Sequence, residues 1–411
     1  MATRAEDRGE ALVAGGRAVK MGPRWLARAF AGSGGAILDR IDRGLAAGRI
    51  DGILPDGTRR TLGGRAPGFV AEVELKDWRA LLRVATSGSV GLFQGWDKGE
   101  WSSPDPVQLF ALFMANAATL GDLARARGPW RWLASRLHKA RANSRAGAAR
   151  NIHRHYDLGN DFYAAWLDPA MVYSSARFDL GPDSLAAAQD DKLRAIASRV
   201  EGAKTVLEIG CGWGALAARL RGGGAAVTAI SLSEAQLAYA RAAHDGIDFR
   251  HQDYRDVAGT FDAIVSVEMV EALGREYWPV FIETLARNLG PGGRAALQFI
   301  TLRDDLYDAY AASADFIQAY VFPGGMLLRL SEFRRLAEAH GFAWENQIDF
   351  GPDYAETLRL WRDNFDAAVR DNRLPPGFDD RFVKLWRYYL MYCEGGFRGG
   401  GIDVHQVTLV R

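Results

Sequence analysis

The sequence is poor in cysteine and carries almost no net charge. Its 411 residues include two cysteines, Cys211 and Cys393, which cannot build a disulfide framework and lack the spacing of metal ligands, so we expect no metal site. Lys and Arg total 51 against 50 Asp and Glu, and the net charge therefore selects no class of partner.

Long apolar runs are also missing. None reaches the roughly 18 residues that span a membrane, and the N-terminal residues hold no sustained apolar core that would indicate a signal peptide. We therefore expect a cytoplasmic chain with reduced cysteines, whose contact with any membrane is peripheral.

Acidic residues are absent between Leu123 and Tyr156. The same segment carries nine basic side chains, namely Arg125, Arg127, Arg131, Arg136, Lys139, Arg141, Arg145, Arg150 and Arg154. Such a block is typical of a surface that binds phosphate groups, in an anionic bilayer or a nucleic acid, and otherwise of a solvated linker. Trp130 and Trp132 are interleaved with the arginines, which keeps a nucleic-acid modification enzyme among the hypotheses.

The length of the chain predicts two domains. Helical periodicity over residues 22–48 is followed by a hairpin pattern at Asp56-Gly57, a half-buried strand, a short helix over residues 77–85, a glycine-rich passage over residues 87–101 and a further helix. We expect three parts: a small α+β domain, a basic linker and a larger second domain, over residues 1–122, 123–150 and 151–411.

From about residue 200 onward, apolar runs alternate with helical patterns. Beginning with a strand, the two patterns alternate over residues 205–210, 215–220, 226–232, 234–243, 261–267, 277–289 and 293–300. This alternation predicts an α/β, doubly wound, Rossmann-like domain, in which helices cover both faces of a parallel sheet. Ligands of such folds bind at the carboxyl ends of the strands.

A glycine loop, GCGWG, follows the first of these strands. Gly210, Gly212 and Gly214 leave no Cβ atoms in the way of a ligand that approaches the main chain and the next helix. Because the spacing is not GxGxxG, the loop fits S-adenosylmethionine better than NAD, and a plain structural turn is the alternative. Ser231 ends the next strand and Asp253 follows in HQDYRD, so we expect three polar positions to converge on one crevice.

The strand over residues 226–232 ends without an acid. In many class I methyltransferases an acidic residue at this point holds both ribose hydroxyls of the cofactor. Here Ser231 and Gln236 would have to take that role.

The most specific string in the chain is NIHRHYDLGNDFYAAWLDPAMVYSSARF, residues 151–178. Together with the glycine loop, SLSEAQ, QDYRD, VSVEMVEALG, RNLGPGG and FIQAYVFPGG, it resembles the cyclopropane-fatty-acyl-phospholipid synthase family over nearly the whole chain. The resemblance implies that residues 151–411 are a methyltransferase catalytic domain. Such an enzyme transfers the methyl group of S-adenosylmethionine to the cis double bond of an unsaturated phospholipid acyl chain, with a cyclopropane as the default product.

The partners and the location are expected from the resemblance together with the basic segment and the composition. An unsaturated phospholipid is the substrate, and an anionic membrane surface is expected at the inner face of the membrane. No nucleic acid is expected, and a homodimer is left open.

The resemblance also assigns the cofactor site. Its residues are Tyr173, Ser174, Gly210, Gly212, Gly214, Ser231, Gln236, Asp253 and Tyr254. For the two tyrosines, ordinary core packing is the alternative.

In the family, a bicarbonate ion removes the proton that is lost on ring closure. The resemblance places Glu271, Ile300 and Tyr354 at that anion site, with Glu271 as the candidate essential carboxylate; a helix N-terminal charge or a surface salt bridge is the alternative. Two further positions depart from the family pattern, because Ser175 stands in place of the usual cysteine and Gln298 in place of the usual histidine.

Both replacements can still donate a hydrogen bond to an anion, but glutamine cannot change its protonation state. Ala272 likewise stands where histidine is common. These departures put ring closure in doubt more than methyl transfer. A methylene-branched, methyl-branched or methylated-alkene product is therefore the alternative to the ring.

Methylation of an alkene produces a carbon cation that water would trap, so a dry, aromatic wall is expected. The candidates for that wall, or for ordinary packing, are Phe316, Tyr320, Phe322, Tyr307 and Tyr310.

Two other classes of protein stay open: a nucleic-acid methyltransferase, and a lipid-binding protein without activity. The basic segment lacks an accompanying RNA-binding motif, and the intact cofactor motifs favour an enzyme.

Overall fold

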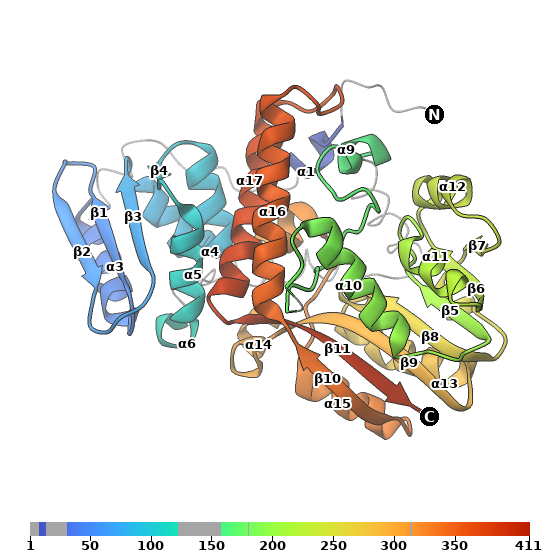
Figure 1. Cartoon of the computed structure of the whole chain (residues 1–411). Helices are drawn as coiled ribbons and strands as arrows, with labels where there is room; N and C mark the ends of the chain where they lie inside the picture. Colours follow the sequence, from blue (N-terminus) through green and yellow to red (C-terminus); the bar gives the residue numbers. More distant parts are fainter. Residues whose placement is uncertain (1–7, 14–30, 122–157, 180, 313–314) are drawn as a thin grey trace. The chain divides into compact units, whose positions relative to one another are not determined.

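The computed structural model describes residues 8–13, 31–121, 158–179, 181–312 and 315–411 (Figure 1). The chain forms two compact units that are interleaved along the sequence. The first comprises Met1–Arg141, Asp305–Pro323 and Gly377–Ile402, and the second comprises Ala142–Asp304, Gly324–Pro376 and Asp403–Arg411. The predicted basic linker, residues 123–150, lies outside the described residues, so what we expect of it stays a prediction.

The first unit contains a four-stranded sheet with the order β2-β1-β3-β4. β1 (Arg49–Ile53) and β2 (Arg59–Gly63) form an antiparallel hairpin, as the Asp56-Gly57 pattern predicts. β3 (Val70–Leu75) pairs parallel with β1 and antiparallel with β4 (Trp101–Ser102). Its helices are α1 (Glu10–Val13), α3 (Ala31–Gly44), α4 (Arg79–Asp97), α5 (Pro106–Ala115), α6 (Ala117–Leu120), α14 (Asp304–Ala311), the π-helical η6 (Ile317–Val321) and α17 (Asp380–Arg398).

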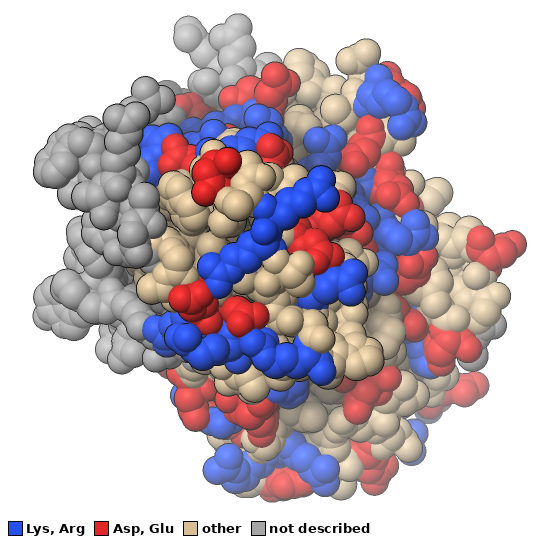
Figure 2. Space-filling model, turned by 90° about the vertical axis from the view of Figure 1, so that its left-hand side faces the viewer, with Lys and Arg blue, Asp and Glu red and all other residues tan. Residues whose placement is uncertain are grey.

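The side of the molecule that carries β1 and β2 has mixed charge. Figure 2, which faces this side, shows Lys and Arg side chains interspersed with Asp and Glu side chains. Arg65 pairs with Asp42 at 2.8 Å and Lys76 with Glu74 at 3.3 Å. Exposed pairs of this kind add little stability. In the described part of this face, both signs of charge are therefore present.

The glycine-rich passage is largely helical. α4 continues through it with a kink at Gly88, where φ is +57° and ψ is −134°. Its two halves approach closely because Gly91 lacks a side chain: a Cβ there would lie 2.0 Å from the carbonyl oxygen of Arg83. The short helix predicted over residues 77–85 is thus only the first half of α4, and the glycines permit a reversal and a backbone contact.

Aromatic packing explains why two late segments belong to the first unit. The ring centroid of Phe93 lies 5.0 Å from that of Phe316, 4.8 Å from that of Tyr320 and 5.0 Å from that of Tyr388. All four side chains are at most 3% exposed. An uninterrupted domain over residues 151–411 does not describe this packing, and two candidates for the aromatic wall, Phe316 and Tyr320, are part of this core.

The second unit is built on a seven-stranded sheet with the order β10-β11-β9-β8-β5-β6-β7. The pairs β5–β6, β5–β8, β6–β7 and β8–β9 are parallel, and β10 is antiparallel to β11. The strands are β5 (Thr205–Ile209), β6 (Ala226–Ser231), β7 (Asp248–His251), β8 (Phe261–Val267), β9 (Leu289–Leu302), β10 (Ala343–Asp349) and β11 (Ile402–Val410). The parallel part confirms the predicted α/β fold.

Helices cover both faces of this sheet (Figure 1). α10 (Leu185–Ser198), α11 (Ala215–Gly222) and α12 (Glu234–Ala243) share one apolar core with it. On the other face lie α13 (Trp278–Asn288) and α15 (Leu330–Ala339), whose Trp278 and Phe333 rings are 6.3 Å apart. The unit also contains α9 (Asn160–Ala164), α16 (Gly351–Arg370) and the 3₁₀ turns η3 (Tyr254–Asp256), η4 (Val270–Ala272) and η5 (Arg275–Tyr277).

Among the described residues of both units, no helix combines the length and the apolar character that crossing a bilayer requires.

The variant Phe93→Ala tests the interleaved core. Truncation of a buried phenylalanine costs about 3–5 kcal/mol, and here it removes ring contacts to both late segments. We expect hydrogen–deuterium exchange of the variant to show faster exchange in η6 and α17 and unchanged exchange in β5 and β8. Unchanged protection of α17 would contradict the shared core.

Candidate active site

A pocket lies at the carboxyl ends of β5, β6 and β8, where a doubly wound fold binds its ligands. Eight of the nine residues predicted to hold the cofactor line this pocket. They are Tyr173, Ser174, Gly210, Gly212, Ser231, Gln236, Asp253 and Tyr254.

The glycine loop forms one wall of the pocket. Gly210 and Gly212 both have positive φ, +84° and +53°. A Cβ on Gly210 would lie 2.8 Å from the Cγ of Met269, whereas a Cβ on Gly212 would meet no atom within 4 Å. Gly212 therefore leaves space on the ligand's side of the loop.

Gly214 is the ninth predicted residue, and it does not line the pocket. It is the N-cap of α11, with φ of +92°. A Cβ there would lie 2.9 Å from the His244 ring and 3.0 Å from the Phe249 ring. Gly214 thus allows α11 to pack closely against neighbouring side chains, and its predicted contact with the cofactor is not supported.

Uncharged polar groups stand at the end of β6. The hydroxyl oxygen of Ser231 lies 3.4 Å from Oε1 of Gln236, and Gln236 is only 3% exposed. Ser233 caps α12 by accepting a hydrogen bond from the backbone N–H of Gln236. A hydroxyl and an amide therefore face the place where many related folds have an acid.

The next wall of the pocket holds Asp253 and Tyr254. Asp253 accepts hydrogen bonds from the guanidinium of Arg255 at 2.8 and 2.5 Å. Burial raises the pKa of Tyr254 to about 12. The hydroxyl of Tyr254 has no hydrogen-bond partner among the described residues, so a ligand could supply one.

Buried charges line the floor of the pocket. Lys192, fully buried on α10, donates a 2.6 Å hydrogen bond to the hydroxyl of Ser174. Burial lowers the pKa of Lys192 to about 8, against the opposing effect of Glu268, Asp168 and Glu208. Burial also raises the pKa of Glu208 to about 8. No periodic pattern or motif in the sequence indicates Lys192.

The residues predicted for the anion site lie together in a buried cluster beside the pocket. Ser175 is 0% exposed and Gln298 is 1% exposed. The backbone N–H of Ile300 donates a short hydrogen bond to the carboxylate of Glu271. Tyr354, in the first turn of α16, reaches the same region because its hydroxyl shares a partner with Ser175 and Gln298.

That shared partner is Glu268, which is not among the predicted site residues. Its Oε1 accepts hydrogen bonds from the backbone N–H of Ser175 at 2.9 Å and from Nε2 of Gln298 at 2.8 Å. Its Oε2 accepts one from the Tyr354 hydroxyl at 2.7 Å. Glu268 also lines the cofactor pocket, so it joins the two sites.

Glu268 has an unusual backbone conformation. Its φ is +48°, in the left-handed region that residues with a Cβ rarely adopt. An acid that directly follows β8 was the signal in the sequence that could have identified it, because functional side chains follow strand ends in this fold.

Glu271 is held differently. Burial, followed by the nearby charge of Glu268, raises the pKa of Glu271 to about 8. Its Oε2 has no hydrogen-bond partner among the described residues. At neutral pH this carboxyl group is therefore expected to carry a proton.

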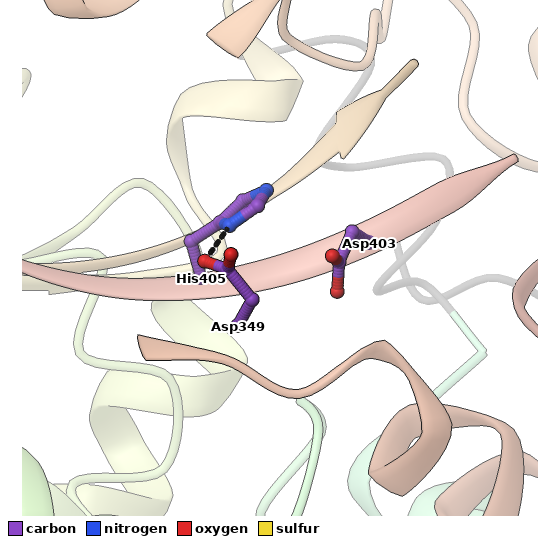
Figure 3. Close-up of side chains that lie close together, drawn as sticks. All are labelled: Asp349, Asp403 and His405. Carbon is purple, nitrogen blue, oxygen red and sulfur yellow. Dashed lines mark hydrogen bonds and ion pairs between the residues drawn. The ribbon is translucent and has the colours of Figure 1, made fainter. Parts of the chain in front are cut away.

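A second group of ionisable side chains, Asp349, Asp403 and His405, lies at the start of α16 (Figure 3). Nδ1 of His405 is 2.7 Å from Asp349, and its Nε2 is 2.7 Å from the Thr301 hydroxyl. Asp403 accepts hydrogen bonds from the backbone N–H groups of Gly351 and Val404. Both nitrogens of His405 are engaged, and the group fixes the helix turn that carries Tyr354.

The seven-stranded sheet, the glycine loop after β5 and the pocket above it define the class of protein. They are the features of the class I methyltransferase fold, whose cofactor is S-adenosylmethionine. Residues 143–407 match the family described as mycolic acid cyclopropane synthetase, and the chain belongs to this family of S-adenosylmethionine-dependent methyltransferases.

Curated relatives cover most of the chain. It is 38% identical over 350 residues to tuberculostearic acid methyltransferase UfaA1 of Mycobacterium tuberculosis, with 80% of each chain covered. It is 33% identical over 361 residues to the cyclopropane-fatty-acyl-phospholipid synthase of Escherichia coli, with 85% of this chain and 90% of the relative covered.

Solved structures agree with this assignment. The mycolic acid cyclopropane synthase CmaA1, complexed with SAH and CTAB, has a TM-score of 0.60 and 27% identity, covering 64% of this chain and 98% of that one. The cyclopropane synthase MmaA2 of Mycobacterium tuberculosis has a TM-score of 0.59 and 26% identity at the same coverage.

The variant Gly212→Ala should weaken cofactor binding without unfolding the chain. A methyl group at this position enters open space beside the loop, where the ligand would lie. We expect calorimetry with S-adenosylhomocysteine to show a Kd at least about tenfold higher, which is about 1.4 kcal/mol.

Gly202→Ala is the matched control. Gly202 also has a positive φ, +84°, a Cβ there would meet no atom within 4 Å, and the residue does not line the pocket. The strain of a left-handed alanine is therefore common to both variants. Equal affinities of the two variants would contradict the predicted role of Gly212.

Binding of a cationic methyl donor should release protons near pH 8. Positive charge in the pocket favours the ionised form of Glu208 and the neutral form of Lys192, so it lowers both pKa values, which lie at about 8. Calorimetry in buffers with different ionisation enthalpies should give different binding enthalpies for S-adenosylmethionine. Glu208→Gln should reduce that difference, and equal enthalpies in all buffers would refute the prediction.

Proposed function

We propose that this chain transfers the methyl group of S-adenosylmethionine to a carbon of the cis double bond in an unsaturated phospholipid acyl chain. The observation that carries the proposal is the contact between the two sites, because Glu268 lines the cofactor pocket and also belongs to the buried carboxylate cluster. The names of two relatives, a cyclopropane-fatty-acyl-phospholipid synthase and a tuberculostearic acid methyltransferase, support a lipid acyl substrate.

The residues of the pocket fit S-adenosylmethionine. Gly212 leaves room for a ligand at the loop, and the Tyr254 hydroxyl and Glu208 Oε2 are buried atoms without a partner among the described residues. Ser231 and Gln236 would hold the ribose, and the loop would face the methionine part. When bound, S-adenosylmethionine supplies an electrophilic methyl group on a positively charged sulfur.

The chain's own groups then have two tasks. The pocket walls exclude water, which would otherwise trap the cation that forms on the acyl chain. The carboxylate of Glu268 places negative charge near the cationic donor and near the substrate cation, and the charge of the bound donor favours the ionised form of Glu208. A neutral Glu271 avoids a repulsion between two adjacent carboxylates.

The product is proposed to be a cyclopropane, as in the Escherichia coli relative, and a branched product is the second candidate. One observation favours the branch: the relative at 38% identity is named as a tuberculostearic acid methyltransferase. In either case the acyl chain gains one carbon.

Membrane contact is a further part of the proposal. It rests on the basic segment 123–150, which lies outside the described residues, and on the lipid substrate. Binding to anionic vesicles that weakens with added salt is what an electrostatic contact requires.

Product analysis with the full-length chain tests the function. The chain is incubated with S-adenosylmethionine carrying a ¹³C methyl group and with vesicles of dioleoyl or, as the matched control, dipalmitoyl phosphatidylglycerol. We expect mass spectrometry to show one added CH₂ in the oleoyl chains only, and NMR to distinguish a ring from a branch. Label in the head group, or in neither lipid, would contradict the proposal.

A further inference from the structure

We propose that the carboxylate of Glu268 is the base of this reaction and takes the place that the family resemblance gives to a bicarbonate ion. This inference rests on the proposed function. It assigns a role to a residue that lies in the VSVEMVEALG segment but is not among the predicted site residues.

Three hydrogen bonds join Glu268 to the residues of the predicted anion site. The donors that converge on its two oxygens are the Ser175 N–H, the Gln298 amide and the Tyr354 hydroxyl, at 2.7 to 2.9 Å. They belong to the same residues that the resemblance assigns to an anion. A carboxylate and a bicarbonate ion both present two oxygens on a planar carbon, so one set of donors suits either.

A bicarbonate ion therefore does not fit as an additional ligand here. Each of these donor groups already has a partner in Glu268. The remaining group of the predicted set, Glu271, accepts a hydrogen bond from the Ile300 N–H, which occupies that donor as well. An added anion would also stand next to the negative charge of Glu268.

The surroundings favour the ionised form of Glu268. All three side-chain and backbone partners act as donors toward it. Burial raises its pKa, while the hydrogen bonds from Tyr354, Ser175 and Gln298 and the charge of Lys192 lower it. Oε2 of Glu271 has no such donor among the described residues, and the pKa of Glu271 is raised to about 8. Of the two side chains, Glu271 is therefore expected to be the protonated one.

Gln406 orients the side-chain amide of Gln298. Its Oε1 accepts a hydrogen bond from Nε2 of Gln406 at 3.0 Å, which turns its own Nε2 toward Glu268. A histidine is not needed at this position when the base is a carboxylate of the chain. The departure at Gln298 and the presence of Glu268 thus have a common explanation.

The backbone at Glu268 supports a functional role. A left-handed conformation of a residue with a side chain costs on the order of 1–3 kcal/mol and is found mostly where function requires it. Here it follows the end of β8 directly, and the side chain lies at the wall of the cofactor pocket.

Ring closure transfers one proton to Glu268. The alkene π electrons form a bond to the methyl carbon as its bond to sulfur breaks, and the sulfur keeps that electron pair. The cation then remains on the other alkene carbon. A C–H bond of the new methyl group breaks, its proton goes to an oxygen of Glu268, and its electron pair closes the three-membered ring.

A branched product requires the same base. If a hydride first shifts from the methylated carbon to the cationic carbon, loss of a proton from the new methyl group gives a methylene branch. Glu268 accepts the proton in both cases and releases it to water after the product leaves.

Removal of the carboxylate and its replacement from solution test this role. The wild-type chain should be equally active in CO₂-free buffer and in buffer with added bicarbonate. Glu268→Gly should lower turnover about 100-fold or more, the usual contribution of a positioned base. Since glycine leaves space beside the three donors, added formate, acetate or bicarbonate should raise the turnover of Glu268→Gly at least about tenfold.

Two further variants serve as controls. Glu268→Gln keeps the shape of the side chain without a basic oxygen, so it should be as inactive as Glu268→Gly and should not respond to added anions. Glu201→Gln changes an exposed glutamate and should behave like the wild type. Binding of S-adenosylhomocysteine by each variant shows that the pocket is still folded.

The outcomes separate this inference from the proposed function. A wild-type chain that adds no carbon to oleoyl lipid refutes the function and, with it, the base. A wild-type chain that is active but needs bicarbonate refutes only the role of Glu268. The same holds if Glu268→Gly keeps its activity, or if it binds S-adenosylhomocysteine but is inactive with every added anion.

Discussion

The second unit depends on the hydrogen bonds that surround one carboxylate, that of Glu268, which lies partly buried at the wall of the cofactor pocket. An ionised group in such a place is stable only if donors and a compensating charge surround it. Glu268 receives its donors from three parts of the chain: Ser175 after α9, Gln298 in β9 and Tyr354 in α16. Lys192 on α10 adds a buried positive charge. The same group therefore fixes the relative positions of several elements and faces the cofactor pocket.

A base that belongs to the chain changes the chemistry of the site in a definite way. A soluble anion has to bind before each turnover and competes with other anions, whereas a side chain is always present at a fixed position. Two features of the site oppose this arrangement energetically. Glu268 adopts a strained backbone conformation with a positive φ, and Glu271 next to it has to be neutral. The group formed by His405, Asp349 and Asp403 acts indirectly on the site, because it holds the start of α16 and therefore positions Tyr354.

Much of this arrangement could be predicted from the sequence. Alternating apolar and helical patterns indicated the doubly wound sheet, and positions after the strand ends indicated Gly210, Gly212, Ser231 and Asp253 of the pocket wall. The family resemblance indicated the other four, namely Tyr173, Ser174, Gln236 and Tyr254. Spacing alone could not distinguish Gly214, which supports helix packing, from Gly212, which borders open space. The position of Glu268 directly after β8 could have marked it as a candidate, but its donors lie 30 or more positions away in either direction, so no local pattern shows what it contacts.

The interleaving of the two units was unpredictable for a similar reason. α17 (Asp380–Arg398) has an apolar face, but its sequence does not show which partner covers that face, and Phe93 lies far away in the sequence. The glycines of α4 posed the opposite problem, because their local signal indicates flexibility while tertiary contacts make them helical.

The role of Glu268 can be tested with a crystal structure of the chain bound to S-adenosylhomocysteine and grown in the presence of bicarbonate. We expect the Glu268 carboxylate to lie within hydrogen-bond distance of the Ser175 N–H, the Gln298 amide and the Tyr354 hydroxyl, with no separate anion among them. Density for a bicarbonate ion on those three donors, with the side chain of Glu268 turned elsewhere, would contradict it.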